Sequence, residues 1–296
     1  MVDQAEDLRK LMKEKKDELQ EIKKNNQNKT RIISVTSGKG GVGKTNIAIN
    51  LGLAYKKIGK SVVIIDADLG LANANIILGT TPQYNLYHVI RKKKHMKDII
   101  IDTSYGIKLV AGASGFSEIA NMTEEDRTHF INELYELANT DIIIIDTSAG
   151  ISRNVLSFLE ASDEVIVVTT TEPTSIADAY GIIKTVAKEI DNCDINLKLI
   201  VNRVASAQNS KEIAERIINI AGQFLNVKVE YLGFIYNDDA VFNAVSGQKP
   251  FFDYFPSSKA SSCLRHIVAK LEKVEYNEVS GGFSKFLKKL FTRKGH

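Results

Sequence analysis

The sequence predicts an α/β fold with a mainly parallel sheet and helices on both faces. Short runs of β-branched and aliphatic residues recur along the chain, and helical patterns separate them. Several of these runs are apolar at every position, as in strands buried on both faces of a parallel sheet. The first run is followed directly by a glycine-rich loop and a helical pattern. We expect an N-terminal helical extension and a C-terminal amphipathic helix outside this core.

The composition is ordinary for a globular protein. The 296 residues are 44% hydrophobic and 25% charged, enough for a sizeable core. No apolar run reaches the about 18 residues of a membrane-spanning helix, and the N-terminus is too charged for a signal peptide, so we expect a cytoplasmic protein. Cys193 and Cys263 lie far apart without a histidine cluster, which argues against a zinc or iron–sulfur site within one chain. We interpret both as packing residues.

The strand predicted at Ile32–Thr36 leads into a phosphate-binding loop. Its pattern is Gly38-x-x-x-x-Gly43-Lys44-Thr45, in which glycines let backbone N–H groups point at a phosphate chain. Lys44 should reach the β and γ phosphates, and the Thr45 hydroxyl suits Mg²⁺. The fold is therefore expected to be that of a P-loop NTPase. The candidate nucleotide-binding residues of this loop are Gly38, Lys39, Gly40, Gly41, Val42, Gly43, Lys44, Thr45 and Asn46.

The second lysine of the loop carries a family resemblance. The segment Lys39-Gly40-Gly41-Val42-Gly43-Lys44-Thr45 resembles the deviant Walker A motif of the MinD/ParA ATPases. In that family the extra lysine crosses to the partner's phosphates, so that ATP is sandwiched in a dimer. The resemblance implies an ATPase that uses ATP and Mg²⁺ and forms a homodimer with ATP, with Lys39 and Lys44 as catalytic residues. The alternative is that Lys39 is a solvated loop lysine.

Two acids follow the next predicted strand, Ser61–Ile65. Asp66 and Asp68 stand at its carboxyl end, where ligands bind in open α/β sheets. Asp66 is a candidate to hold a water molecule on Mg²⁺, and Asp68 to orient or deprotonate the attacking water. By resemblance this is the family's switch I, with Asp68 at the position of the hydrolytic aspartate. The alternative is that Asp66 or Asp68 caps the following helix.

A third acid ends the buried strand predicted at 141–146. Asp146 follows four isoleucines and precedes a glycine turn at Gly150. It fits a Walker B carboxylate that holds a water on Mg²⁺, and Gly150 would let switch II move with the γ-phosphate. The candidate metal-site residues are therefore Thr45, Asp66 and Asp146.

The segment between these acids is less regular. Leu86–His95 contains a basic run, which we interpret as a solvated helix end, with a binding patch as the alternative. Ile107–Ala111 predicts a strand. Thr123-Glu124-Glu125-Asp126 predicts a capping box for a helix that ends at Ala138.

Three strand–helix units follow Asp146. The predicted strands are Glu164–Thr169, Leu197–Val201 and Val227–Tyr236, and the predicted helices are Ser175–Ile190, one ending at Leu225 and one starting near Asp238. After the second strand, Asn202-Arg203 resembles the family's adenine-binding pair, in which an amide exchanges donor and acceptor bonds with the base. At Tyr236-Asn237-Asp238 many relatives have proline where this chain has tyrosine, so a purely structural turn is the alternative to a base-contacting loop.

Residues 1–29 are expected to form a partner-binding segment and linker, before an ATPase domain at 30–275. Apolar residues at helical spacing end at a polar run, 25–28, which predicts a helix and a linker. Its start resembles the D-Q-A-x-x-L-R activator segment of flagellar-number regulators in the MinD group. In those relatives the segment engages a signal-recognition-type GTPase and stimulates its hydrolysis. The alternative is a solvated terminal helix, and the matching residues are Asp3, Gln4, Ala5, Leu8 and Arg9.

Residues 276–296 are expected to form a hinge and a membrane-targeting helix. The net charge is +3, yet residues 281–296 alone hold five basic and no acidic residues. A terminal, cationic, aromatic-rich amphipathic helix suits an anionic membrane surface, and docking on the protein itself or on a partner is the alternative. The apolar face is Phe283, Phe286, Leu287, Leu290 and Phe291, and the basic residues are Lys285, Lys288 and Lys289.

Together the motifs and both terminal segments resemble flagellum-number regulators of the FlhG (FleN, YlxH) type. The resemblance implies an ATPase switch, peripheral on the inner face of the cell membrane, that regulates flagellum number or placement through a flagellar GTPase. One alternative is a MinD that positions the division septum, which would not need the N-terminal segment. The other is a ParA-type DNA-partitioning ATPase, but the acidic body and aromatic tail argue against it, so no nucleic-acid partner is expected.

Overall fold

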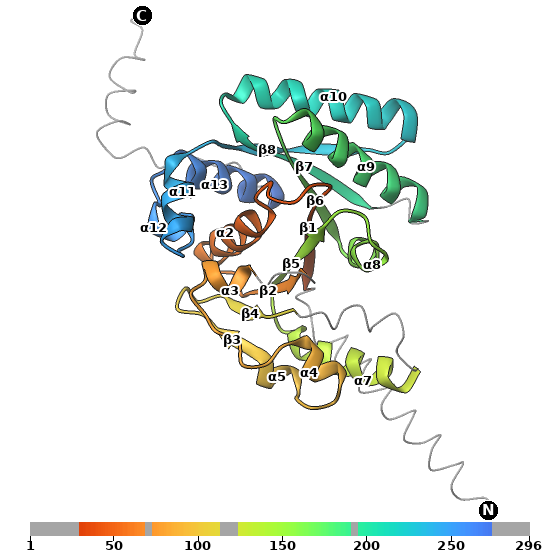
Figure 1. Ribbon diagram of the computed structural model, residues 1–296, viewed down its shortest axis with the longest axis vertical. Coiled ribbons are helices and arrows are strands. Elements are labelled where there is room, and N and C mark those ends of the chain that lie inside the picture. The colour runs from red at the N-terminus through yellow and green to blue at the C-terminus, as the bar shows by residue number, and fades with distance from the viewer. Residues whose placement is uncertain (1–29, 69–72, 113–123, 191–194, 274–296) are drawn as a thin grey trace, which may run out of the picture.

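Within the described residues, 30–68, 73–112, 124–190 and 195–273, eight strands of the computed structural model form one sheet in the order β3-β4-β2-β5-β1-β6-β7-β8 (Figure 1). Neighbouring strands are parallel except for the antiparallel pair β3 and β4. The predicted mainly parallel sheet is confirmed. The strands are β1 Arg31–Ser37, β2 Val62–Ala67, β3 Ile100–Asp102, β4 Lys108–Val110, β5 Ile142–Ala149, β6 Glu164–Thr170, β7 Asn196–Val204 and β8 Val229–Tyr236.

Helices cover both faces of this sheet, as the sequence predicted. In Figure 1, α2 and α11–α13 lie on one side of the strands, and α8–α10 lie on the other. A third group, α4, α5 and α7, packs near the β3 edge. The helices are α2 Lys44–Lys57, α3 Ala74–Ile77, α4 Leu86–Ile90, α5 Met96–Ile99, α7 Glu124–Leu134, α8 Arg153–Glu160, α9 Pro173–Glu189, α10 Ala207–Leu225, α11 Asp239–Ser246, α12 Phe251–Tyr254 and α13 Lys259–Leu271.

The isoleucine run of β5 explains why both faces need cover. Successive side chains of a strand point to opposite faces. Ile142 and Ile144 accordingly join the core beneath α2 and α13, whereas Ile143 and Ile145 join the core beneath α4 and α7. A strand that is apolar at every position is therefore buried on both sides, which keeps β5 in the middle of the sheet.

The structure differs from the sequence expectations at the edges of elements. The strand β3 and the helix α8 were not predicted, and β5 continues past Asp146 to Ala149. The helix after residue 123 ends at Leu134, and a 3₁₀ turn, Tyr135–Leu137, carries the chain to the predicted end. Thr123, the expected cap, lies outside the described residues. The basic run leaves α4 at Ile90 and forms a largely exposed turn, which agrees with a solvated helix end.

The two ends of the described core are tied together beside the start of β1. Arg31 donates hydrogen bonds to Glu164 at 2.7 Å and to Glu272 at 2.6 Å. Glu272 follows α13, so the first strand and the last helix share one ion pair. The division of the chain at 29 and 275 stays a prediction. Cys263 is buried, as expected of a packing residue, and Cys193 lies outside the described residues.

Candidate nucleotide site

The loop between β1 and α2 takes a shape that depends on its glycines. Gly41 and Gly43 have φ angles of 77° and 98°, in the left-handed region that favours glycine. At Gly38 an added Cβ would lie 2.3 Å from the backbone oxygen of Asp178 in α9, so a side chain has no room there. The Ser37 hydroxyl closes the loop by donating to the Lys39 carbonyl at 2.7 Å. The sequence-predicted loop is thus packed against α9.

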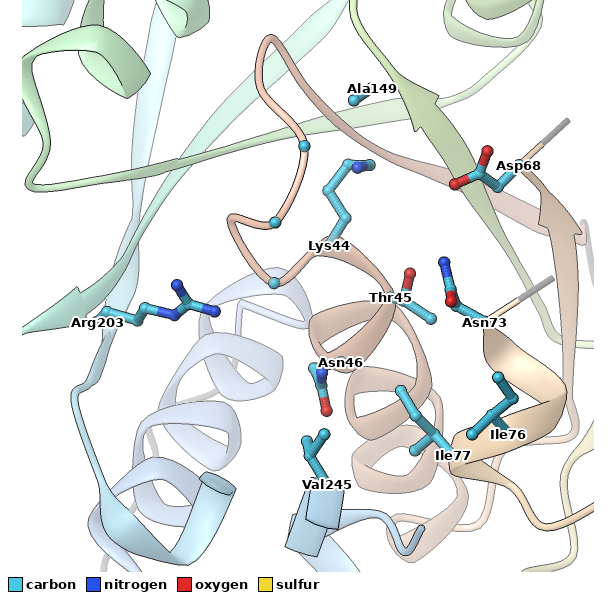
Figure 2. A pocket seen from close by; sticks show the side chains of 13 residues that line it. Lys44, Thr45, Asn46, Asp68, Asn73, Ile76, Ile77, Ala149, Arg203 and Val245 are labelled. Carbon is cyan, nitrogen blue, oxygen red and sulfur yellow. The ribbon is translucent and has the colours of Figure 1, made fainter. Parts of the chain in front are cut away.

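A cavity of about 530 Å³ opens at the start of α2. Figure 2 shows Lys44 near its centre, with Arg203 on one side and Asp68 on the other. The helix N-terminus and the Lys44 ammonium make one end of this cavity electropositive, which suits a phosphate chain. Of the predicted nucleotide and catalytic residues, those that line it are Gly40, Gly41, Gly43, Lys44, Thr45, Asn46, Asp68 and Arg203.

Two buried carboxylates lie side by side on adjacent strands behind this cavity. Asp66 of β2 and Asp146 of β5 are paired in register and are 2% and 1% exposed. Neither oxygen of Asp146 makes a hydrogen bond of ordinary geometry among the described residues, although the Thr45 hydroxyl lies close enough to lower the pKa of the carboxyl. Burial raises the pKa of Asp146 to about 7 and that of Asp66 to about 6. Because a buried charge needs compensation, this pair suits a nearby cation.

The turn after β2 uses Asp66 as a hydrogen-bond acceptor. Its Oδ1 accepts from the Asp68 N–H at 3.1 Å, and its Oδ2 accepts from the Ala74 N–H at 3.2 Å. Ala74 is the first residue of α3, so Asp66 accepts a hydrogen bond from the start of the next helix. For Asp66 or Asp68, such a capping role was the alternative expectation from the sequence. Asp68 points to the cavity (Figure 2). The two acids therefore occupy different environments although only one residue separates them.

The extra lysine, Lys39, does not line the cavity. Its Nζ donates to Glu172 Oε2 at 2.7 Å and to the Thr174 hydroxyl at 3.0 Å. Glu172 immediately precedes α9, and the hydrogen bond and charge of Lys39 lower the pKa of Glu172. Lys39 is thus held by its own chain in this structure.

The predicted adenine-binding pair divides between two places. Arg203 lines the cavity, whereas Asn202 is buried beneath the loop and donates to the Val42 carbonyl at 2.7 Å. Gly38, Val42, Asp66 and Asp146 likewise surround the cavity without lining it. The predicted residues therefore gather around one cavity, but not all of them face it.

Comparison with known proteins identifies the family. Residues 30–199 match the AAA domain family. The chain is 35% identical to the antiactivator FleN of Pseudomonas aeruginosa, over 82% of this chain and 86% of FleN. It is 34% identical to the flagellum site-determining protein YlxH of Helicobacter pylori, over 91% of this chain and 92% of YlxH. Its fold matches the septum site-determining protein MinD of Pyrococcus horikoshii, complexed with Mg-ADP, with a TM-score of 0.66 and 24% identity over 82% of this chain and 96% of that one.

The chain belongs to the MinD/ParA family of P-loop ATPases. The resemblance that the lysine-bearing loop suggested is confirmed, and so is the ATPase activity that it implied. The cavity at the start of α2 is therefore the candidate site at which this MinD/ParA ATPase binds ATP.

Five residues that line the cavity of this MinD/ParA ATPase were not predicted from the sequence. Val245 comes from α11, whose position over the loop depends on packing more than 190 residues further along the chain. Ala149 lines the cavity because β5 continues past Asp146 to this residue. The additional lining residues are Asn73, Ile76, Ile77, Ala149 and Val245. An apolar stretch at the end of a helix could have suggested Ile76 and Ile77, but nothing local points to Val245.

Both terminal predictions for this ATPase lie outside the described residues. These are the partner segment at residues 3–9 and the amphipathic helix at residues 283–291. Within the part of the chain that is described, no helix is long and apolar enough to cross a membrane.

Proposed function

We propose that this ATPase is a switch that regulates the number or placement of flagella. The observation that carries the proposal is the similarity to FleN and YlxH, because it spans at least 82% of this chain and at least 86% of each relative. YlxH is named for determining the flagellum site, and FleN is named an antiactivator. Deleting the gene and counting flagella by electron microscopy tests the proposal. An altered count or position, restored by the wild-type gene, is expected; normal flagella with misplaced septa would favour the septum-positioning alternative.

The proposed reaction at the site is attack of water on the γ-phosphate of ATP. Lys44 binds the β and γ phosphates, and Asp68 orients or deprotonates the water. Mg²⁺ supplies charge neutralisation at the phosphates when it is bound. The Asp146 oxygens are buried and make no hydrogen bond of ordinary geometry among the described residues, so they fit that ion through its waters, and the nearby Thr45 hydroxyl is a suitable direct ligand.

The proposed magnesium site needs the nucleotide to complete it. Among the described residues no group of three or more His, Cys, Asp and Glu side chains is placed to hold a metal ion. Mg²⁺ is usually held by one or two carboxylates together with substrate phosphates and water. We therefore propose that Mg²⁺ binds with ATP, held by Thr45 and the phosphates, with Asp66 and Asp146 behind its waters.

ATP is proposed to close a homodimer in which Lys39 reaches the partner's phosphates. Exposed apolar side chains beside the cavity support a protein partner at this face. Ile76 is 49% exposed on α3 and Val245 is 39% exposed on α11, and both line the nucleotide cavity. A second subunit over the cavity would bury them, and apolar burial stabilises association.

The C-terminal amphipathic helix is proposed to bring the dimer to an anionic membrane surface. One such helix binds weakly, because each basic residue near the surface adds about 1 kcal/mol and ordering the helix has a cost. Two helices on a closed dimer bind the membrane with an affinity about 10²- to 10⁴-fold higher than one helix, because the first contact raises the effective concentration of the second. The switch therefore binds membrane with ATP and leaves it after hydrolysis.

Liposome sedimentation with ATP tests the membrane proposal. Phe286→Glu places a charge on the apolar face of the predicted helix and should abolish binding to anionic vesicles. Phe224→Glu is the matched control, because Phe224 is 69% exposed on α10 and its replacement leaves the core intact. Equal sedimentation of both variants would contradict a role of the C-terminal helix in membrane binding.

The N-terminal segment is proposed to stimulate a flagellar signal-recognition-type GTPase. Deleting residues 1–28 leaves β1 and the nucleotide site in place. The truncated protein should therefore hydrolyse ATP normally but fail to accelerate the GTPase. The single variant Arg9→Ala should weaken the stimulation as well. Undiminished stimulation by the truncated protein would contradict this role.

A further inference from the structure

Asn50 connects the helix that follows the P-loop to α12 through a buried hydrogen bond. Its Oδ1 accepts from the N–H of Phe252 at 2.8 Å, across 202 positions of sequence. Asn50 lies within α2 and is 0% exposed. Because a buried amide is unfavourable unless its polar atoms are bonded, this position has a contact that an apolar residue of the same size could not make.

The amide of Asn50 is held in one orientation. Its Nδ2 donates to the Asn46 carbonyl at 2.7 Å, one turn earlier in α2. The Phe252 N–H only donates and the Asn46 carbonyl only accepts, so a flipped amide would lose both bonds. Asn46 itself lines the nucleotide cavity. The fixed amide therefore lies one helical turn from that cavity.

The helix α12 obtains its cap from this asparagine. Pro250 is the residue before α12, and no side-chain bond from that position caps the helix. The first N–H groups of a helix have no partner within the helix, and the N–H of Phe252 is one of them. Phe251 and Phe252 are 1% and 7% exposed, in the same core as α2. One buried hydrogen bond and two aromatic side chains thus fix α12 on α2.

The position of α12 in turn determines that of α11. The turn between them is closed by bonds from the Lys249 N–H to the Ala244 carbonyl at 2.9 Å and from the Gln248 N–H to the Val245 carbonyl at 3.0 Å. Of the eight residues of α11, Ala244 alone is buried, so this helix depends on its ends for its position. Val245 extends from α11 to the cavity wall (Figure 2).

We propose that Asn50 is a positioning residue for nucleotide binding, which fixes α12 and through it α11, so that Val245 closes one wall of the cavity. In Figure 2, Val245 and Lys44 lie at opposite ends of the view. Because the phosphates bind at the start of α2, the wall formed by Val245 meets the nucleoside part of the ligand. This role concerns one subunit and is independent of the proposed dimer, membrane and GTPase partners.

This role predicts a difference between two ligands. Without the bond, α12 and α11 populate other positions, and the apparent affinity for ADP falls by the fraction that remains competent. Pyrophosphate has no nucleoside and does not reach that wall, so its affinity should stay the same. A general loss of stability would not separate the two ligands in this way.

The test measures the affinities for ADP and pyrophosphate, each with Mg²⁺, by titration calorimetry. Asn50→Leu keeps the size of the side chain and removes both bonds. We expect ADP to bind about tenfold more weakly and pyrophosphate to stay within about twofold of the wild type. Ile217→Ala is the control, because Ile217 is 1% exposed on α10 in the core on the opposite face of the sheet. This control should lower stability but change neither affinity.

Two results of this titration would overturn the role of Asn50. The first is an equal loss of affinity for both ligands in Asn50→Leu. The second is an ADP affinity within twofold of the wild type.

A double-variant comparison tests whether Asn50 acts through Val245. Val245→Ala alone should weaken ADP binding about threefold, because it removes part of the wall. In Asn50→Leu the wall is already displaced, so adding Val245→Ala should change the ADP affinity little. Changes at residues that do not act on one another usually add. Additive losses in the double variant would therefore contradict the proposed route.

Asn50→Asp keeps the test decisive if Asn50→Leu folds poorly. When the new carboxyl is protonated near pH 5, it can accept from Phe252 and donate to Asn46 as the amide does. When it ionises toward pH 9, its second oxygen repels the Asn46 carbonyl. Relative to the wild type at each pH, the ratio of ADP affinity to pyrophosphate affinity should therefore fall as the pH rises. The negative charge by itself weakens both ligands, so a ratio that does not fall would overturn the proposal.

Discussion

The Nζ atom of Lys39 lies 2.7 Å from Oε2 of Glu172, so the extra lysine of the P-loop forms an ion pair within its own subunit. The side chains of the two residues are 39% and 58% exposed. Such an exposed pair contributes little to folding, because solvent screens it. It nevertheless has to open before Lys39 can reach a partner subunit, so Glu172 opposes the proposed dimer.

Replacing Glu172 by Gln should favour dimerisation with ATP. The neutral amide no longer holds the Lys39 ammonium by charge, so the dimer should form at a severalfold lower protein concentration. Light scattering against concentration measures this. Glu189→Gln is the control, because it removes the same charge from an exposed residue at the other end of α9. This variant should dimerise like the wild type. If Glu172→Gln dimerises no more readily than Glu189→Gln, the ion pair does not restrain Lys39.

Asp68→Ala should trap a dimer with ATP but not with ADP. Removing the group that orients or deprotonates the water should slow hydrolysis by about 10²- to 10⁴-fold without removing the phosphate-binding loop. Light scattering with each nucleotide, together with phosphate release, measures both effects. The control is Asp239→Ala, an exposed acid on α11. If both the wild type and Asp68→Ala remain monomeric with ATP bound, the result contradicts the proposed roles of Lys39 and Asp68.

Alanine at two neighbouring loop glycines should have opposite outcomes. In Gly38→Ala the new Cβ would meet the Asp178 backbone 2.3 Å away, so the loop must leave α9, and ADP affinity should fall at least about tenfold. In Gly40→Ala the Cβ meets nothing within 4 Å, and ADP affinity should stay within about threefold. Titration with a fluorescent ADP analogue compares them. Equal losses would show that the contact with α9 does not shape the loop.

The stability of the metal-free protein should fall between about pH 4 and pH 7 through Asp146. Burial raises its pKa in the folded protein from an ordinary 3.8 to about 7. The folded state therefore binds this proton more tightly than the unfolded state does. The free energy of unfolding is highest when both states are protonated, and it falls as the pH rises, until Asp146 is ionised in the folded protein above about pH 7. Asp146→Asn stays neutral, so above pH 7 its free energy of unfolding should exceed that of the wild type by roughly 1 to 3 kcal/mol.

Urea unfolding with a chelator, repeated from pH 4 to pH 8, measures this difference between the two proteins. Other carboxyl groups titrate equally in both, so only the difference reports on Asp146. A difference that does not grow with pH would show that Asp146 is ionised in the folded protein throughout the range.

The parts of the site that follow one another in sequence were predictable. The loop from Gly38 to Thr45 lies between β1 and α2 because a β-branched run, glycines and a helical pattern occur in that order. Asp66 and Asp146 follow apolar runs, and parallel strands bring their carboxyl ends to one edge. The edge strand β3 was missed because it has three residues and only one neighbouring strand.

By itself, the sequence determined the fold class, the phosphate-binding loop and the acids at the ends of the strands. These features depend on backbone propensity and on burial patterns, which act over a few neighbouring residues. Only the tertiary structure decided that Lys39 is bonded to Glu172, that Asn202 lies beneath Gly43, and that Val245 joins the cavity wall. Each of these contacts joins residues more than 130 positions apart, and their partners are set by how the helices pack on the sheet.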